Sequence, residues 1–335
     1  MYRIVHLSDL HYSTASREKA RSMLAAVAAS EPDHLIISGD LTDDGRAVYA
    51  RGLRSLLTQY GFDSCERLTV VPGNHDMYGF IYRTFSKADG LLAGMRSLRT
   101  VKDTVARLRD LHRRLSSYRE RDYDRELGRF RSYYERAFDG CIATYRSRSG
   151  FPFAKLLPNN LAIIGVDTCF YLPKVYSLMN LLRHGMQVMR TKDVTLLGEN
   201  LSGSTGWVDL RALESLLNIP EIRRRRKILS LHHCMHPFSF LLKTHSESCA
   251  KEMQLVNRSA LVDMLRAHRI EMILHGHYHT LHAYYLESGV PVLNSGEHGG
   301  SAFFGLEVSA REMDVRLMGD GTAGMPSHEE PSSLA

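Results

Sequence analysis

Five short clusters of Asp, Asn and His stand out along the sequence, between residue 9 and residue 279. Each offers carboxylate or amide oxygens or imidazole nitrogens, and none offers a cysteine. This donor set suits Mn, Fe, Zn or a similar divalent ion rather than a thiolate site. In chain order the clusters are Asp9-Leu10-His11, Gly39-Asp40-Leu41-Thr42-Asp43, Gly73-Asn74-His75-Asp76, His232-His233 and Gly276-His277-Tyr278-His279. The sequence therefore predicts a metal centre assembled from five parts of the chain.

Each cluster comes directly after a short apolar run with the β-branched content of a buried strand. In open α/β sheets ligands bind at the carboxyl ends of strands, so clusters far apart in sequence can converge on one site. Gly39 and Gly73 fit sharp turns at which the backbone approaches a bound group closely. The runs are Ile4-Val5, Leu35-Ile36-Ile37, Leu68-Thr69-Val70-Val71, Ile228-Leu229 and Met272-Ile273-Leu274.

Each cluster taken singly also has an ordinary structural explanation. Asp40 could cap a helix, Asn74 and Asp76 could form a polar turn, and His232 could be a hydrogen-bonded core histidine. Independent causes of this kind rarely produce all five clusters in order, each after a strand. The metal centre is therefore the stronger interpretation.

The motif set resembles that of the calcineurin-like metallophosphoesterase superfamily: D-x-H, G-D-x-x-D, G-N-H-D, a later His after a strand, and G-H-x-H. The resemblance covers residues 1–76 and about 150–310. It implies a four-layer α/β/β/α sandwich of two mixed sheets with two divalent metal ions. It also implies one ion held by Asp9, His11, Asp40 and His279, and another held by Asp40, Asn74, His232 and His277.

Two metals roughly 3.5–4 Å apart can clamp the attacking and leaving oxygens of an in-line displacement, and a metal-bound water becomes hydroxide near neutral pH. His277 and His279 are two residues apart, so in an extended segment both imidazoles leave the same side, while Tyr278 points away. In the resembling family the histidine of G-N-H-D, here His75, donates to the phosphate or the leaving oxygen. Asp76 is expected to orient that imidazole and keep it protonated, or else to cap a helix.

The fourth cluster departs from the family pattern, in which a single His is followed shortly by Pro. Here three histidines, His232, His233 and His236, precede Pro237. Counting from the end of the strand favours His232 as the ligand, with His233 as the alternative. A late turn, Asn294-Ser295-Gly296, resembles a family turn near the site and is interpreted as structural.

Composition agrees with a soluble enzyme. The chain has 335 residues, 44% of them hydrophobic, with no apolar run near the 18 residues of a transmembrane helix. The first proposed ligand is at residue 9, so cleavage of a typical signal peptide would destroy the site, which favours a cytoplasmic protein. The five cysteines are odd in number and widely spaced, which argues against a disulfide framework, and Cys234 is expected to be a small buried hydrophobe.

An Arg-rich segment separates the third cluster from the fourth. Residues 77–150 contain 15 Arg and 2 Lys against 9 acids, a net charge of +8, whereas the whole chain carries +6. Apolar residues recur at helical spacing from Leu98 to Tyr118 and, less regularly, from Tyr123 to Tyr145, which predicts a helical insertion. Its arginines could cover the metal cleft and bind phosphate. They could also bind nucleic acid, or an anionic membrane surface at which the protein would be peripheral. The structural alternative is a solvated helix face.

A second insertion is expected at about residues 171–204, where an apolar, Met-rich stretch could join Phe238-Ser239-Phe240-Leu241-Leu242 in an apolar wall; packing in a core is the alternative. We interpret residues 1–318 as a single metallophosphoesterase domain with two insertions, and residues 319–335 as a disordered tail.

The function expected from these features is metal-dependent hydrolysis of a phosphate ester, as a phosphodiesterase or phosphomonoesterase. Two alternatives involve larger anions: a nuclease, or a hydrolase of lipid-linked nucleotide diphosphates. A non-catalytic scaffold is disfavoured, because such a protein would be free to lose Asn74, His75 or His277, and all three are present.

Overall fold

The computed structural model describes residues 1–77, 120–170, 205–246, 249–250, 253–296 and 302–319. Three predicted features fall outside these ranges: the helical pattern from Leu98 to Tyr118, the second insertion at 171–204, and the tail after Gly319. Within the described ranges, none of the helices combines the length and apolarity needed to cross a bilayer.

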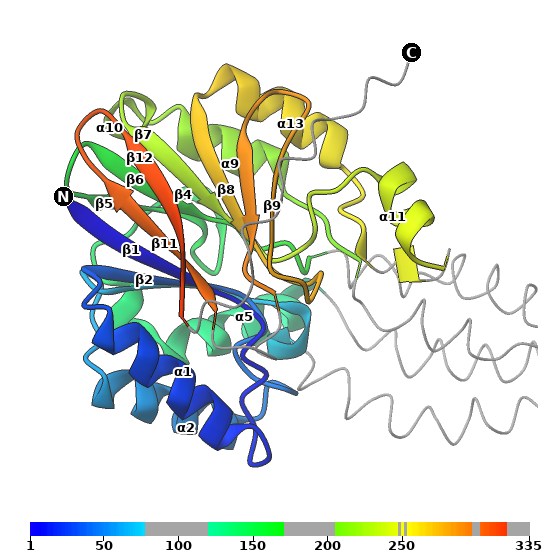
Figure 1. Cartoon of the computed structure of the whole chain (residues 1–335). Coiled ribbons are helices and arrows are strands. Elements are labelled where there is room, and N and C mark those ends of the chain that lie inside the picture. The colour runs from blue at the N-terminus through cyan, green and yellow to red at the C-terminus, as the bar shows by residue number, and fades with distance from the viewer. Residues whose placement is uncertain (78–119, 171–204, 247–248, 251–252, 297–301, 320–335) are drawn as a thin grey trace, which may run out of the picture.

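The chain forms two mixed β-sheets that pack face to face (Figure 1). The first sheet has the order β12-β11-β1-β2-β3, in which β1, β2 and β3 run parallel. Its strands are β1 (Tyr2–Leu7), β2 (His34–Ser38), β3 (Leu68–Val71), β11 (Phe303–Val308) and β12 (Met313–Met318).

The second sheet has the order β4-β5-β6-β7-β8-β10-β9, in which β6, β7, β8 and β10 run parallel. Its strands are β4 (Ile142–Arg148), β5 (Phe151–Leu157), β6 (Leu161–Gly165), β7 (Arg226–Ser230), β8 (Ile270–His275), β9 (His282–Tyr285) and β10 (Pro291–Asn294). All five strands predicted before the donor clusters are present, as β1, β2, β3, β7 and β8.

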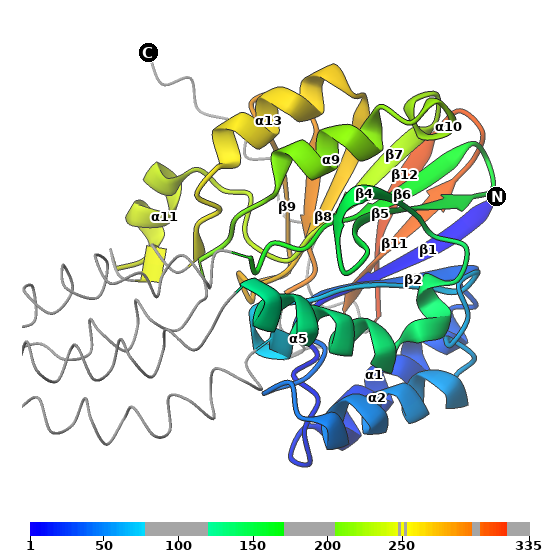
Figure 2. The same ribbon diagram turned by 180° about the vertical axis from the view of Figure 1, so that it is seen from behind.

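Helices cover the outer face of each sheet and complete four layers, α/β/β/α, as the superfamily resemblance predicted (Figures 1 and 2). The first sheet is covered by α1 (Arg17–Ala29), α2 (Ala47–Gln59) and α5 (Glu120–Tyr133), followed by the short η1 (Glu135–Phe138). On the second sheet lie α9 (Leu210–Leu217), α10 (Pro220–Arg223) and α13 (Arg258–Ala267), while α11 (Phe238–Thr244) lies apart at the right of Figure 1.

Alternating residues of the central strands serve two different cores. In β1, Val5 and Leu7 pack against the first helix layer, whereas Ile4 packs between the sheets. In β7, Leu229 faces the second helix layer and Ile228 faces the first sheet. Because successive side chains of a strand point to opposite faces, a strand buried on both faces is apolar throughout. This explains why the strands appear in the sequence as continuous apolar runs.

The end of the Arg-rich segment is not helical. Tyr123, Leu127, Phe130 and Tyr134 are buried in the core beneath the first helix layer, which confirms the helical pattern there. Farther on, the helical prediction is wrong: residues 142–148 form strand β4, paired antiparallel with β5, and Tyr145 is 87% exposed. Hairpin pairing with β5 overrides the weak helical periodicity at this point.

Candidate metal centre

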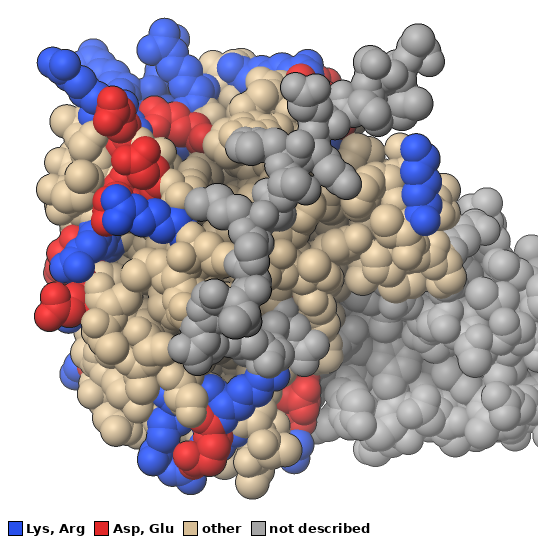
Figure 3. Space-filling model, in the orientation of Figure 1, with Lys and Arg blue, Asp and Glu red and all other residues tan. Residues whose placement is uncertain are grey.

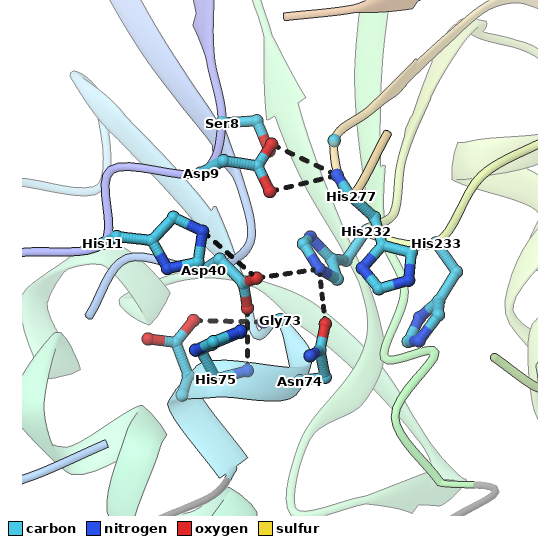
Figure 4. A network of polar contacts seen from close by, with 12 residues as sticks. Ser8, Asp9, His11, Asp40, Gly73, Asn74, His75, His232, His233 and His277 are labelled. Atoms are coloured by element: carbon cyan, nitrogen blue, oxygen red, sulfur yellow. Dashed lines mark hydrogen bonds and ion pairs between the residues drawn. The ribbon is translucent and has the colours of Figure 1, made fainter. Parts of the chain in front are cut away.

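The sheet topology brings the five predicted clusters together. β1, β2 and β3 are parallel neighbours in the first sheet, and β7 and β8 are parallel neighbours in the second. Their carboxyl ends therefore meet at one end of the sandwich. Figure 4 shows the side chains of Asp9, His11, Asp40, His232 and His277 turned toward a common centre.

The donors of the described residues form three close groups, two of which consist of predicted ligands and are each small enough to surround one ion; the third is His11, Asp43 and His75. In the first group the donor atoms of Asp9, His11, Asp40 and His279 all lie within 4.8 Å of one another, and in the second the same holds for Asp40, His232 and His277. Asp40 belongs to both. Its Oδ2 lies 3.7 Å from Nε2 of His11 and 3.4 Å from Nε2 of His232, the position expected of a bridging carboxylate.

Asp40 fits a cation site in a second respect. Its side chain is fully buried, and Oδ1 accepts a hydrogen bond of 2.8 Å from the backbone N–H of His75. Oδ2 receives no hydrogen bond of good geometry from the described residues, and the nearest potential donor is Nε2 of His232 at 3.4 Å. Burying a carboxylate oxygen without a donor is costly, and coordination by a metal removes that cost. Oδ1 of Asn74, the remaining predicted ligand, lies 2.9 Å from Nε2 of His232.

The protonation states also favour positive charge at this centre. Burial raises the pKa of Asp9, but the hydrogen bond with His279 and the charge of His232 outweigh it and lower this pKa to about 2. Burial opposes ionisation of Asp40 as well, yet His232 and His75 hold its pKa well below the usual range. Burial lowers the pKa of His232, and the Asp40 carboxylate more than compensates, raising it to about 9. Two buried carboxylates thus attract the positive charge that divalent ions would supply.

Five of the predicted ligands adopt left-handed backbone conformations. The φ angles are 53° for Asp9, 41° for His11, 47° for Asp40, 68° for His277 and 50° for His279. Such angles cost non-glycine residues about 1 to 2 kcal/mol each and persist where the surrounding structure enforces them, often at functional sites. The fold holds the chain in a strained path at the points where it presents these donors.

The two glycines singled out in the sequence are required by close contacts. Gly39 has φ of 97°, and a Cβ at this position would overlap the ring of His232. A Cβ at Gly73 would overlap the backbone and carboxylate of Asp40. Both positions therefore need glycine so that ligands from different strands can approach.

Asp76 has a different role from the predicted one. Its carboxylate accepts hydrogen bonds from the backbone N–H groups of Leu41 (3.0 Å), Thr42 (2.8 Å) and Gly73 (3.0 Å), and from the Thr42 hydroxyl (2.9 Å). The imidazole of His75 is instead held through Nδ1, 2.7 Å from the carbonyl oxygen of Asp43. The expected orientation of the His75 imidazole by Asp76 is thus corrected: Asp76 ties the loop after β2 to the loop after β3.

A helix starts directly after Gly73, and residues 74–77 are helical. Asp76 is the third helical residue and accepts from the N–H just before the helix, the arrangement of a capping box. The alternative prediction, that Asp76 is the N-cap of a helix, is therefore wrong in position, because Gly73 occupies the N-cap and Asp76 lies three residues later. Burial and the nearby charge of Asp40 raise the pKa of Asp76 to about 6.

The structure separates the two candidate histidines of the fourth cluster. Nδ1 of His232 is 3.0 Å from the carbonyl oxygen of Ser38, so Nε2 is turned toward Asp40. Nδ1 of His233 lies 2.7 Å from the Thr168 hydroxyl, in a second layer behind His277. The geometry favours His232 over His233.

The sequence held a sixth strand-and-donor cluster that was missed. Strand β6 is followed by Asp167 and Thr168, and the Thr168 hydroxyl supports His233. The Asp167 carboxylate accepts hydrogen bonds of 2.8 and 2.7 Å from the hydroxyl of Tyr123 in α5. Burial raises the pKa of Asp167 to about 6. An apolar run followed by Asp-Thr is the same signal that revealed the other clusters.

Tyr278 points away from the metal donors, as expected, and packs in a small cluster with α11. Cys234, Leu241 and Ala250 are the buried members of this cluster, which confirms the core interpretation of Cys234. Ser295, in the late turn, donates a 3.1 Å hydrogen bond to the carbonyl oxygen of His6 and so joins the two sheets.

The described part of the Arg-rich segment uses several of its arginines in ion pairs. Arg129 pairs with Glu126 at 2.9 Å, and Arg148 pairs with Asp124 at 3.2 Å. These contacts agree with the solvated-face alternative for residues 120–148. A cap over the metals would depend on residues 78–119, which lie outside the described ranges.

Comparison with known proteins identifies the class. The family model for calcineurin-like phosphoesterases matches residues 2–281, so the chain belongs to this family. Among solved structures, a dimetal phosphatase from Danio rerio is similar, with a TM-score of 0.53 and 14% identity over 95% of this chain and 96% of that chain. At this identity the likeness shows the fold alone. A comparison with curated proteins gives no match.

Two further structures are more distant. A phosphopantetheinyl hydrolase from Mycobacterium tuberculosis has a TM-score of 0.44 and 14% identity, over 88% of this chain and 89% of that chain. A purple acid phosphatase from yellow lupin has a TM-score of 0.46 and 12% identity, over 96% of this chain and 52% of that chain. The family match and the grouped donors support metal-dependent hydrolysis of phosphate esters.

Proposed function

We propose that the protein is a phosphoesterase that uses two divalent ions at the convergence of β1, β2, β3, β7 and β8. One observation carries the proposal: buried Asp40 belongs to both donor groups, and its Oδ2 faces His11 and His232 but receives no hydrogen bond of good geometry from the described residues. Two ions bound there would polarise the phosphate ester and lower the pKa of a bound water molecule.

The residues of the centre would divide the work as follows. Asp9, His11, Asp40 and His279 would hold one ion, and Asp40, Asn74, His232 and His277 would hold the other. The side chain of Asp9 and the G-H-x-H loop are already joined, because the Asp9 carboxylate accepts from the backbone N–H of His277 at 3.0 and 3.1 Å. This bond links the first sheet to the second at the centre, so neither half of the site is placed independently.

His75 is the proposed proton donor. A hydrogen bond from Nδ1 to the carbonyl oxygen of Asp43 fixes the tautomer and turns Nε2 into the nitrogen that acts on the substrate. In the imidazolium form, Nε2–H would donate its proton to a phosphate oxygen or to the leaving oxygen. The ring of His75 packs edge to face against that of His11, with centroids 4.5 Å apart, which places the donor beside the first ion's ligands.

The test uses an aryl phosphodiester and an aryl phosphomonoester, with bound metal measured in the same samples. Asp40→Asn preserves volume but removes the bridging charge, and we expect hydrolysis to fall at least about a hundredfold, the scale for losing one group that stabilises transition-state charge. Bound metal should fall as well. Asp44→Asn, on the same loop and paired with Arg46, is the matched control and should retain both. Undiminished turnover in Asp40→Asn would refute the proposal.

A further inference from the structure

A second concentration of charge lies at the opposite end of the second sheet from the metal centre. The sequence Arg223-Arg224-Arg225-Arg226-Lys227 runs from the end of α10 into β7, and Arg269 precedes β8. The predicted ligands His232 and His277 follow the other ends of these two strands. At about 3.3 Å per residue, strands of this length separate the two ends by roughly 17–20 Å. We call Arg223, Arg224, Arg225, Lys227 and Arg269 the basic pole.

The basic pole is held in place by hydrogen bonds to backbone carbonyls. Nζ of buried Lys227 donates to the carbonyls of Arg223 (3.1 Å), Arg225 (2.7 Å) and His268 (3.1 Å), which ties the loop before β7 to the turn before β8. The guanidinium of Arg225 donates to the carbonyl of Leu157 at 3.4 Å. The two segments that carry the exposed arginines are therefore joined. Binding would cost little conformational entropy, because their backbone is already held in place.

The three outer arginines carry uncompensated charge. Arg223, Arg224 and Arg269 are exposed, and among the described residues no carboxylate oxygen lies within 4.0 Å of their side-chain nitrogens. Arg226 differs, because it pairs with Glu271 at 2.8 Å. Figure 3 shows Lys and Arg side chains at the upper left, over α10, with Asp and Glu side chains directly beside them.

Acids near the basic pole only partly offset it, and one of them, Glu271, pairs with Arg226 and also acts electrostatically on Lys227. Glu221 is an exposed residue of α10, and Glu214 of α9 acts electrostatically on His268. The pKa of His268 is nevertheless lowered, by burial first and then by the charges of Lys227 and Arg223. Positive charge therefore prevails where the two segments meet.

We propose that the basic pole docks the protein on an anionic lipid surface. Guanidinium groups bind lipid phosphates bidentately, and a small group of arginines is attracted to an anionic leaflet by about 1 kcal/mol, or about fivefold in affinity, for each arginine. Nucleic acid fits less well, because residues 220–227 and 268–270, which form the basic pole, contain no Phe, Tyr or Trp on which bases could stack. Docking by this end leaves the metal centre directed away from the lipid.

The test measures co-sedimentation of the full chain with vesicles of purely zwitterionic lipid and with vesicles in which a third of the lipid is anionic. The variant Arg223→Gln/Arg224→Gln/Arg269→Gln should lose about a hundredfold in partitioning to the anionic vesicles, from about fivefold for each arginine. A matched control, Arg17→Gln/Lys19→Gln/Arg51→Gln, removes the same charge from exposed positions of α1 and α2 and should stay within about twofold of the unmodified chain.

Binding of single-stranded nucleic acid is measured for the same variants. Three outcomes would overturn the inference: no preference of the unmodified chain for anionic vesicles, equal losses of vesicle binding in both triple variants, or a loss confined to nucleic-acid binding. The last would reassign the basic pole to nucleic acid. Aryl-ester hydrolysis and the urea midpoint of both variants show that each remains folded, since neither set touches the metal donors.

Discussion

Replacing Asp76 by alanine should destabilise the protein and weaken metal binding together. The substitution removes the acceptor of four hydrogen bonds, three of them from the backbone N–H groups of Leu41, Thr42 and Gly73. Each buried donor left without a partner costs about 1 to 3 kcal/mol. A small pocket, bordered by Asp76, Thr42 and Tyr134, opens to solvent beside this carboxylate, so water can reach part of the vacated space. The lower end of the range, about 1 kcal/mol for each of the four donors, then applies, and we expect a loss of about 4 kcal/mol.

Urea unfolding at pH 7, with metal content measured on the same samples, checks this expectation. Asp44→Ala is the control on the same loop: its ion pair with Arg46 lies at the surface, where such pairs contribute about 0 to 1 kcal/mol. A purely structural role of Asp76 would lower the urea midpoint without changing metal affinity at low denaturant. An unchanged midpoint in Asp76→Ala would refute the reasoning, because the four hydrogen bonds would then contribute nothing.

Two other perturbations test separate parts of the site. His75→Ala should lower hydrolysis by about 10² to 10⁴, the range for losing a general acid, while bound metal stays constant; a parallel loss of metal would make His75 a ligand instead. Asp167→Asn tests a buried carboxyl whose pKa is raised from 3.8 to about 6. Because the folded state binds this proton more tightly than the unfolded state, the free energy of unfolding of the wild type falls by up to about 3 kcal/mol as pH rises from about 4 to above 6. In urea unfolding the Asn variant should gain stability relative to wild type over that pH window, and a difference independent of pH would contradict the assignment.

Much of the fold follows from the order of apolar runs and donor clusters. Strands buried on both faces need continuous apolar sequence, as in Leu35-Ile36-Ile37, and polar donors placed directly after such runs can only lie at strand ends. Parallel neighbours then place those ends together, which is why Asp9 and Asp40 were recognisable from the sequence. The weak helical periodicity up to Tyr145 gave a less reliable prediction. The strand at Tyr145 forms by pairing with β5, and the local sequence pattern does not specify that partner.

The sequence by itself determined the class of chemistry, because Asp, Asn and His in five strand-end clusters have few uses other than holding metal ions. Only the tertiary structure decided how those residues divide their roles. It placed His232 toward Asp40 and His233 against Thr168, and it turned Asp76 into a tie between two loops. These outcomes depend on distances between side chains from different strands. A one-dimensional pattern fixes which residues reach an end of the sheet, whereas the packing of the two sheets fixes which atoms meet there.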